Sequence, residues 1–182
     1  PRNWTRKRRL SSVAKLNGDF ATAQRLIEEV IANDRIGGIP IADRIELVRT
    51  ALAGGDRELA RTKLAELATE ERAQLSHEER LNIDCLEAML LDKEAGEKRF
   101  ERIRAELGRI ELGAEALLDA IRVALHYADR ELADRLAERL LGGAEARRAF
   151  QAMLEIFRQQ GMEEHFRKLQ RAVAARRLQR KQ

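Results

Sequence analysis

The sequence has few of the residues that break helices or cross-link a chain. Its 182 residues include two prolines and one cysteine, and 4% are aromatic. The lone Cys85 excludes an internal disulfide, which fits a reducing compartment but leaves the periplasm open. Scarce proline with 36% charged residues and abundant Ala, Leu, Glu and Arg is typical of solvated helices, so we expect almost no strand.

Long apolar runs are also missing. No stretch approaches the roughly 18 to 20 apolar residues that a membrane-spanning helix requires, and no apolar signal-peptide core follows the basic start. The 44% hydrophobic content is still enough to bury a core. We therefore expect a soluble, folded chain, and because it starts at Pro1 we also consider a fragment of something longer.

Residue patterns that carry catalysis or bind cofactors are absent too. His77, His126 and His165 fall in different parts of the chain, and none has a His or Cys partner at zinc-ligand spacing. Cys85 lies in an apolar segment without a neighbouring His, which favours an inert buried thiol. Glycine-rich phosphate loops do not occur. We expect no metal, no cofactor and no enzymatic activity.

Charge is strongly segregated along the chain. Residues 1–10 carry five Lys/Arg and no acid, residues 147–182 carry a net charge of +7, and the total is +4, so residues 11–146 carry −8. The two basic ends could be solvated caps of a repeat array, RNA contacts, or a segment beside a membrane.

A repeated unit is the strongest signal in the sequence. The pentapeptide at 56–60 recurs letter for letter at 129–133. Related stretches begin at Gly18, Gly55, Leu91, Ala128 and Gly161. The first four starts are almost equally spaced and the last comes slightly early. Such regular spacing over most of a chain indicates a solenoid of stacked supersecondary units.

Each related stretch has the features of a helix that packs closely on another. An aspartate follows the start in four stretches, at Asp19, Asp56, Asp92 and Asp129, where it can cap free backbone N–H groups. A small residue follows four places later, at Ala23, Ala60, Gly96 and Ala133, and lets a second helix approach.

An amphipathic segment precedes each of these stretches. The preceding segments are 4–16, 41–53, 77–90, 114–127 and 144–160. Glycines and Pro40 fall between the segments, where turns are needed. We therefore predict ten helices in five hairpins, with repeats at approximately 4–37, 41–74, 77–110, 114–143 and 144–178 of a single domain spanning 1–182.

This pattern resembles the tetratricopeptide repeat. The likeness rests on the Gly-Asp turn, the small residue after it, and the apolar residues four and seven places beyond, as in Ala23, Ile27 and Val30. The resemblance covers essentially the whole chain and implies an all-α, right-handed α-solenoid. The helix-closing proline of that family is missing, and Sel1-like repeats or another α-solenoid are the alternatives.

In tetratricopeptide arrays the first helices line a concave groove that holds a peptide or a partner helix. Carried over to this chain, the resemblance implies a partner-binding groove formed by Arg8, Lys15, Ile45, Arg49, Leu52, Leu81, Leu118, Arg122 and His126. Carboxylates of an amphipathic segment would meet Arg49 and Arg122.

We therefore expect a non-enzymatic scaffold that binds another protein. Analogy with divergent tetratricopeptide arrays suggests a bacterial envelope, secretion or exopolysaccharide assembly. The chain would be cytoplasmic, at the inner face of a membrane if its basic start follows a membrane anchor or contacts anionic lipid. The alternative is an RNA-associated helical-repeat protein that uses both basic ends, which the scarcity of aromatic stacking platforms disfavours.

Overall fold

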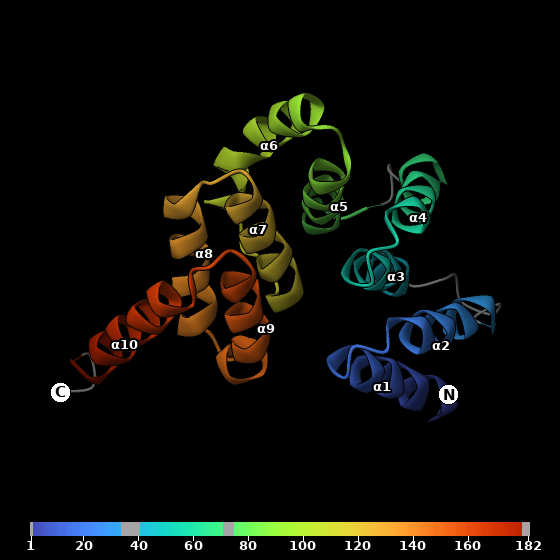
Figure 1. The fold of residues 1–182 in the computed structure, drawn as a ribbon, viewed down its shortest axis with the longest axis horizontal. Helices are drawn as coiled ribbons and strands as arrows, with labels where there is room; N and C mark the ends of the chain where they lie inside the picture. The colour runs from blue at the N-terminus through green and yellow to red at the C-terminus, as the bar shows by residue number, and fades with distance from the viewer. Residues whose placement is uncertain (1, 34–40, 71–74, 180–182) are drawn as a thin grey trace. The chain divides into compact units, whose positions relative to one another are not determined.

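The structure, a computed structural model, describes residues 2–33, 41–70 and 75–179. These residues form ten α-helices and no strand (Figure 1). The all-α prediction and the predicted ten helices are confirmed, while the predicted repeat ends at 37 and 74 lie outside the described residues. The chain packs as two compact units, residues 1–76 and 77–182, and each is described by itself below.

The N-terminal unit holds two helical hairpins. Its helices are α1 (Arg2–Leu16), α2 (Phe20–Asn33), α3 (Ile41–Ala53) and α4 (Arg57–Glu70). Helix α2 packs on both α1 and α3, and α4 packs on α3. The core is aliphatic and fully buried at its centre, where Val30, Val48 and Leu67 have no exposed surface.

The C-terminal unit holds six helices. They are α5 (His77–Leu90), α6 (Lys93–Leu107), α7 (Ala114–His126), α8 (Arg130–Gly142), α9 (Ala146–Gln159) and α10 (Glu163–Gln179). Helix α7 packs on α5, α8 and α9, so the first helices of successive hairpins contact one another. One continuous apolar core runs through all six helices.

The turn inside the hairpins repeats with the sequence. Gly18, Gly55, Ala128 and Gly161 all adopt a positive φ, between 58° and 82°. In each turn the next backbone N–H donates to the carbonyl five residues back, a Schellman closure at the end of the first helix. These bonds are Asp19 to Ala14 and Asp56 to Ala51 at 2.9 Å, and Asp129 to Ala124 and Met162 to Phe157 at 2.8 Å.

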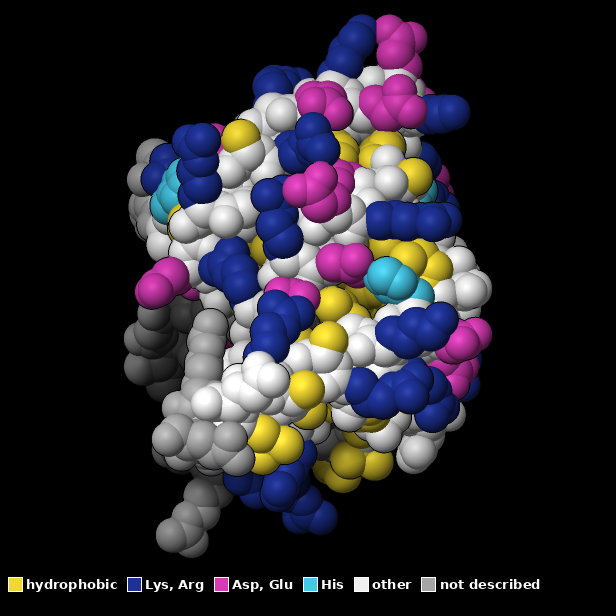
Figure 2. All heavy atoms as spheres, turned by 90° about the vertical axis from the view of Figure 1, so that its left-hand side faces the viewer, with side chains coloured by type: hydrophobic (Ala, Val, Ile, Leu, Met, Phe, Trp, Pro, Cys, Tyr) yellow, Lys and Arg dark blue, Asp and Glu magenta, His cyan; other side chains and the backbone are white. Residues whose placement is uncertain are grey.

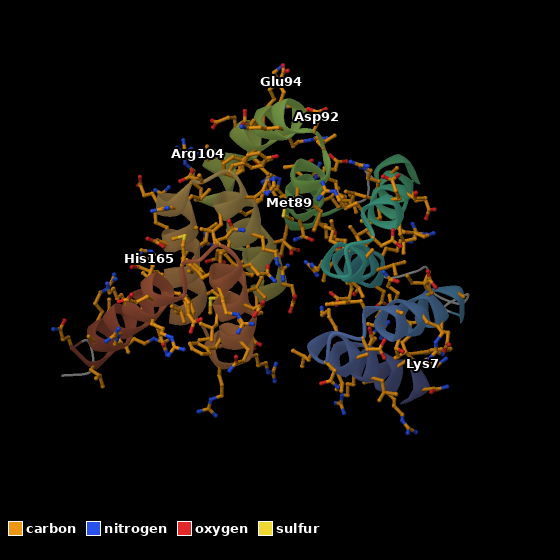
Figure 3. The ribbon with its side chains drawn as sticks, viewed as in Figure 1. Lys7, Met89, Asp92, Glu94, Arg104 and His165 are labelled. Atoms are coloured by element: carbon orange, nitrogen blue, oxygen red, sulfur yellow. The ribbon has the colours of Figure 1, made fainter. Side chains whose placement is uncertain are left out.

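The four predicted aspartate caps are confirmed. A side-chain oxygen of each aspartate accepts from the backbone N–H three residues later, at 3.1 Å for Asp19, 3.0 Å for Asp56, 2.9 Å for Asp92 and 3.0 Å for Asp129. Figure 3 shows Asp92 at the start of α6. Each cap satisfies an N–H of the first turn and starts the second helix of a hairpin.

The small residues of the repeat lie at the contact between paired helices. Ala23, Ala60 and Ala133 have no exposed surface, as expected where another helix approaches closely. Gly96 takes this place in α6, and a Cβ there would lie 2.0 Å from the hydroxyl oxygen of Tyr127. In α10 the same place holds Phe166, which is also completely buried.

Candidate partner-binding cleft

In the N-terminal unit, the predicted cationic groove residues are already paired. The guanidinium of Arg8 donates two hydrogen bonds to the carboxylate of Asp43, at 2.8 and 2.6 Å. The ammonium of Lys15 forms an ion pair with Glu46. Both contacts run from α1 to α3, so these two side chains hold the hairpins of this unit together.

The other three predicted groove residues of this unit are largely covered. Ile45 is 4% exposed, Leu52 is half-buried, and the side chain of Arg49 is 11% exposed beside Glu46, with 3.5 Å between its Nη1 and that carboxylate. A carboxylate introduced at position 49 would therefore lie beside the carboxylate of Glu46, where solvent has little access. Arg49→Glu would lower stability and is unsuitable for testing partner binding.

In the C-terminal unit, Leu81 and Leu118 belong to the buried core. Arg122 donates to the carboxylate of Asp119 at 2.7 Å, and His126 is exposed with its ring edge-on to that of Tyr127. Within each unit, the apolar members of the predicted groove therefore serve packing and do not form an open floor.

An apolar surface depression of this unit lies elsewhere, between α9 and α10. It is a cleft of about 1080 Å³, which we call the α9–α10 cleft. Its lining residues are Leu141, Ala146, Arg147, Phe150, Gln151, Gln170, Val173, Ala174, Arg177 and Leu178. None of the nine predicted groove residues lines it.

The cleft follows from the residue at the helix contact. Phe166 stands where the other second helices have Ala or Gly, and its ring packs on Phe157 at 5.1 Å and Phe150 at 5.6 Å between centroids. A ring in place of a small side chain holds the two backbones apart. Helix α10 accordingly diverges from α9 towards its C-terminal end (Figure 1), and the first half of α9 faces the second half of α10 across the opening.

Arginines lie in this cleft and in a hollow beside it. Arg147 on α9 and Arg177 on α10 line it directly. A neighbouring hollow of about 440 Å³ shares Val173 and Arg177 with the cleft and adds Arg135, Arg139 and Arg176. Figure 2 shows this side of the molecule, where apolar side chains reach the surface among Lys and Arg.

Some of these arginines donate hydrogen bonds to backbone carbonyl groups, which hold the side chains in place without neutralising their charge. Arg177 donates to the carbonyl of Gly142, and Arg139 donates to the carbonyl of Leu107 at 3.3 Å, at the end of α6. Arg147 has no carboxylate partner in the part of the chain that the structure describes. Arg176, in contrast, is paired with Glu138 at 2.6 Å. Arg135 is paired as well, with Glu131 at 3.7 Å. The positive charge at the cleft therefore comes mainly from Arg147 and Arg177, which line it directly.

A third hollow of the unit, about 610 Å³, is polar and lies between α6 and the turn from α7 to α8. Its central pair is Arg104 with Asp129, and Figure 3 shows Arg104 on α6. Burial raises the pKa of Asp129, but hydrogen bonds from Arg104 and the Leu132 N–H, with the charges of Arg104 and Arg135, outweigh it and hold that pKa below 3.8. Arg104 and Asp129 neutralise each other's charge, so we interpret this ion pair as a structural contact.

Comparison with protein-family models, curated proteins and solved structures finds no match for this chain. The tetratricopeptide resemblance therefore stays a prediction. Among the described residues no group of His, Cys, Asp and Glu side chains is placed to hold a metal ion. None of the described helices combines the length and apolar composition needed to cross a bilayer.

The α9–α10 cleft was not predicted from the sequence. One signal for it was present, because the fifth repeat alone replaces the small residue with Phe166 and follows its predecessor at a shorter spacing than the others. A departure from the repeat at its most closely packed position marks the place where the hairpin opens.

Proposed function

We propose that this chain is a non-enzymatic helical-repeat scaffold that binds an acidic, amphipathic helical segment of a partner protein in the α9–α10 cleft. The observation that carries the proposal is an apolar cleft on a helical surface, lined by one arginine from each of its two helices, Arg147 and Arg177. A partner helix would place its apolar residues against Phe150, Val173 and Leu178. Binding of an amphipathic helix in an apolar groove is a common mode of peptide recognition.

The size and openness of the cleft favour a segment of protein. Its volume of about 1080 Å³ lies just above the range of about 300 to 1,000 Å³ that is typical of a small-molecule site. Leu178 is 69% exposed at its edge, so a ligand confined to the floor would leave this side chain in water. A helix lying along α10 would cover it.

The charge around the cleft determines which charged residues the polar face of the partner helix should carry. Arg147 and Arg177 line opposite sides of the opening, and residues 147–182 carry a net charge of +7. Glu or Asp side chains on the flanks of a bound helix would reach these guanidinium groups and form charge-assisted hydrogen bonds. A basic helix with the same apolar face would be repelled.

Two designed helical peptides test this directly. They share one leucine face and differ only in carrying Glu or Lys on their flanks, and binding is measured by fluorescence anisotropy. We expect the acidic peptide to bind at least about tenfold more tightly than the basic one. Arg147→Glu with Arg177→Glu should reverse this preference, and Val173→Asp with Leu178→Asp should abolish binding of both.

Arg148→Glu is the matched control for the charge reversal. Arg148 is the exposed neighbour of Arg147 on α9, pairs with Glu145 at 3.2 Å and lies outside the cleft. It should leave the affinity for both peptides nearly unchanged. Equal affinity for the two peptides, or loss of binding with Arg148→Glu as large as with the cleft variants, would rule out this site.

A further inference from the structure

Helix α1 turns its polar side towards the rest of the N-terminal unit. Four of its residues make inward contacts with α2 or α3 at one-turn spacing along one face. The contacts are Lys7 with Glu29 at 2.7 Å, Arg8 with Asp43 at 2.6 Å, Ser11 with the carbonyl of Ala23 at 3.0 Å, and Lys15 with Glu46. Figure 3 shows Lys7 on this helix. These contacts fix which side of α1 faces outward.

The outward side of α1 carries apolar residues. Leu10, Val13 and Leu16 are 45%, 53% and 79% exposed, and their spacing of three residues places them on one side of the helix. This is the reverse of an ordinary surface helix, in which the apolar stripe faces the core. Packing among the described residues of the unit therefore leaves these three side chains largely uncovered.

Unneutralised positive charge lies on the same side. Arg6 and Arg9 are exposed, and neither has a carboxylate partner among the residues that the structure describes. Helix α1 contains no acidic residue at all. Its outward side is thus basic in the first half and apolar in the second.

We propose that this outward side of α1 binds the surface of an anionic lipid bilayer, with the helix lying in the plane of the interface. Arg6 and Arg9 would contact lipid phosphates, while Leu10, Val13 and Leu16 would enter the boundary between headgroups and acyl chains. A bilayer surface presents negative charge directly above an apolar layer, and amphipathic helices bind it through both. This inference does not depend on the α9–α10 cleft.

The same residues fit other occupants less well. Nucleic acid would use the arginines but leave the three aliphatic side chains in water, and the lone Trp4 lies beside Lys7, whose Nζ is 5.1 Å from the ring centroid, on the inward side. A symmetric pairing of two copies through this face would set the arginines of each copy against those of its partner if the helices ran parallel, or against apolar side chains if they ran antiparallel, and neither arrangement supplies an acid.

Vesicle sedimentation with the full chain tests the proposal. We expect binding to vesicles that mix phosphatidylcholine and phosphatidylserine at about seven to three, little binding to pure phosphatidylcholine, and weaker binding as salt increases. Arg6→Gln with Arg9→Gln should weaken binding to the anionic vesicles by about 30-fold. Val13→Asp with Leu16→Asp should weaken it by roughly tenfold or more, because the apolar contact is lost.

Matched controls carry the same chemical changes elsewhere. Leu91→Asp alters another exposed leucine, 42% exposed, and Arg102→Gln with Arg130→Gln removes two positive charges from exposed positions of α6 and α8. Both should bind anionic vesicles like the unaltered chain. All these positions are exposed, so melting temperatures should not change, and an altered one would identify a folding defect.

Four results would overturn the proposal. One is equal binding to neutral and anionic vesicles, and another is an effect of the control variants as large as that of the α1 variants. The third is displacement of the chain from vesicles by single-stranded RNA together with no effect of Val13→Asp and Leu16→Asp, which would assign the arginines to nucleic acid. Dimerisation that is lost with the α1 variants, without vesicle binding, would likewise assign the face to a second copy.

Discussion

The side-chain amide of Asn82 donates a 3.0 Å hydrogen bond to the carboxylate of Asp119 inside the C-terminal unit. Asn82 is on α5 and Asp119 on α7, and each lies nine residues before the start of its repeat stretch. Both are buried, at 4% and 0% exposure. A polar bond between equivalent places of successive first helices fixes the register in which these hairpins stack, because a buried donor or acceptor without its partner is costly.

Asp119→Ala should therefore destabilise the protein by about 2 kcal/mol, since it leaves the amide of Asn82 and the guanidinium of Arg122 without their shared acceptor. Asp119→Asn keeps an acceptor oxygen and should cost less. Chemical denaturation followed by circular dichroism measures both. Glu115→Ala, on the exposed side of the same helix, should change the free energy of unfolding by no more than about 0.5 kcal/mol. A destabilisation as large as that of Asp119→Ala would contradict a specific role for the Asn82–Asp119 hydrogen bond.

The turn at Ala128 should be improved by glycine. Ala128 has a φ of 58°, whereas three equivalent turns use glycine. Positive φ costs a residue with a Cβ about 1 kcal/mol, so Ala128→Gly should raise the melting temperature. Gly55→Ala is the reverse experiment. A Cβ at Gly55 would meet no atom within 4 Å, so a loss of about 1 kcal/mol would report backbone conformation alone. We therefore expect Ala128→Gly to stabilise the protein and Gly55→Ala to destabilise it.

Gly96 should not tolerate alanine. Its Cβ would lie 2.0 Å from the Tyr127 hydroxyl oxygen and 2.5 Å from the Ala88 carbonyl oxygen, and these two oxygens are themselves joined by a 2.7 Å hydrogen bond. We expect Gly96→Ala to cost about 2 kcal/mol in thermal unfolding, because a helix backbone must shift.

Tyr127→Phe gives the matching measurement. It should cost about 1 kcal/mol, since the Ala88 carbonyl near the end of α5 loses its donor. Adding Gly96→Ala to Tyr127→Phe should still destabilise, because the backbone oxygen of Ala88 remains in the way. A neutral Gly96→Ala would show that the two helices separate more easily than the structure indicates.

The pair of Arg104 and Asp129 should contribute stability at neutral pH and lose it in acid. Because the folded pKa of Asp129 lies below the ordinary 3.8, the unfolded chain binds the proton more readily. The contribution is therefore present above pH 3.8 and disappears as the pH falls through the folded pKa. Asp129→Asn retains the helix cap but not the charge, so its melting temperature should lie below that of the unaltered chain at pH 7 and approach it near pH 2. A constant difference across this range would contradict the prediction.

Much of the fold could be predicted from local sequence. The repeat spacing and aspartate caps indicated the helix order, and the predicted first helices 41–53 and 77–90 coincide with α3 and α5. These signals are local, since a cap or a turn is decided by residues within a few positions of one another. The candidate site was less predictable. The position of a residue within its hairpin does not determine whether its side chain is buried in a core, forms an ion pair or is exposed to water.

The sequence by itself determined the helices, their pairing into hairpins and the turns between them, because each is set by short-range hydrogen bonding and helical periodicity. Only the tertiary structure decided which faces are open. It placed Ile45, Leu81 and Leu118 in the cores, paired Arg8 and Lys15 with α3, and opened the α9–α10 cleft around Phe166. Those outcomes depend on which side chains from distant segments meet, and the volume and charge of the facing helix settle that.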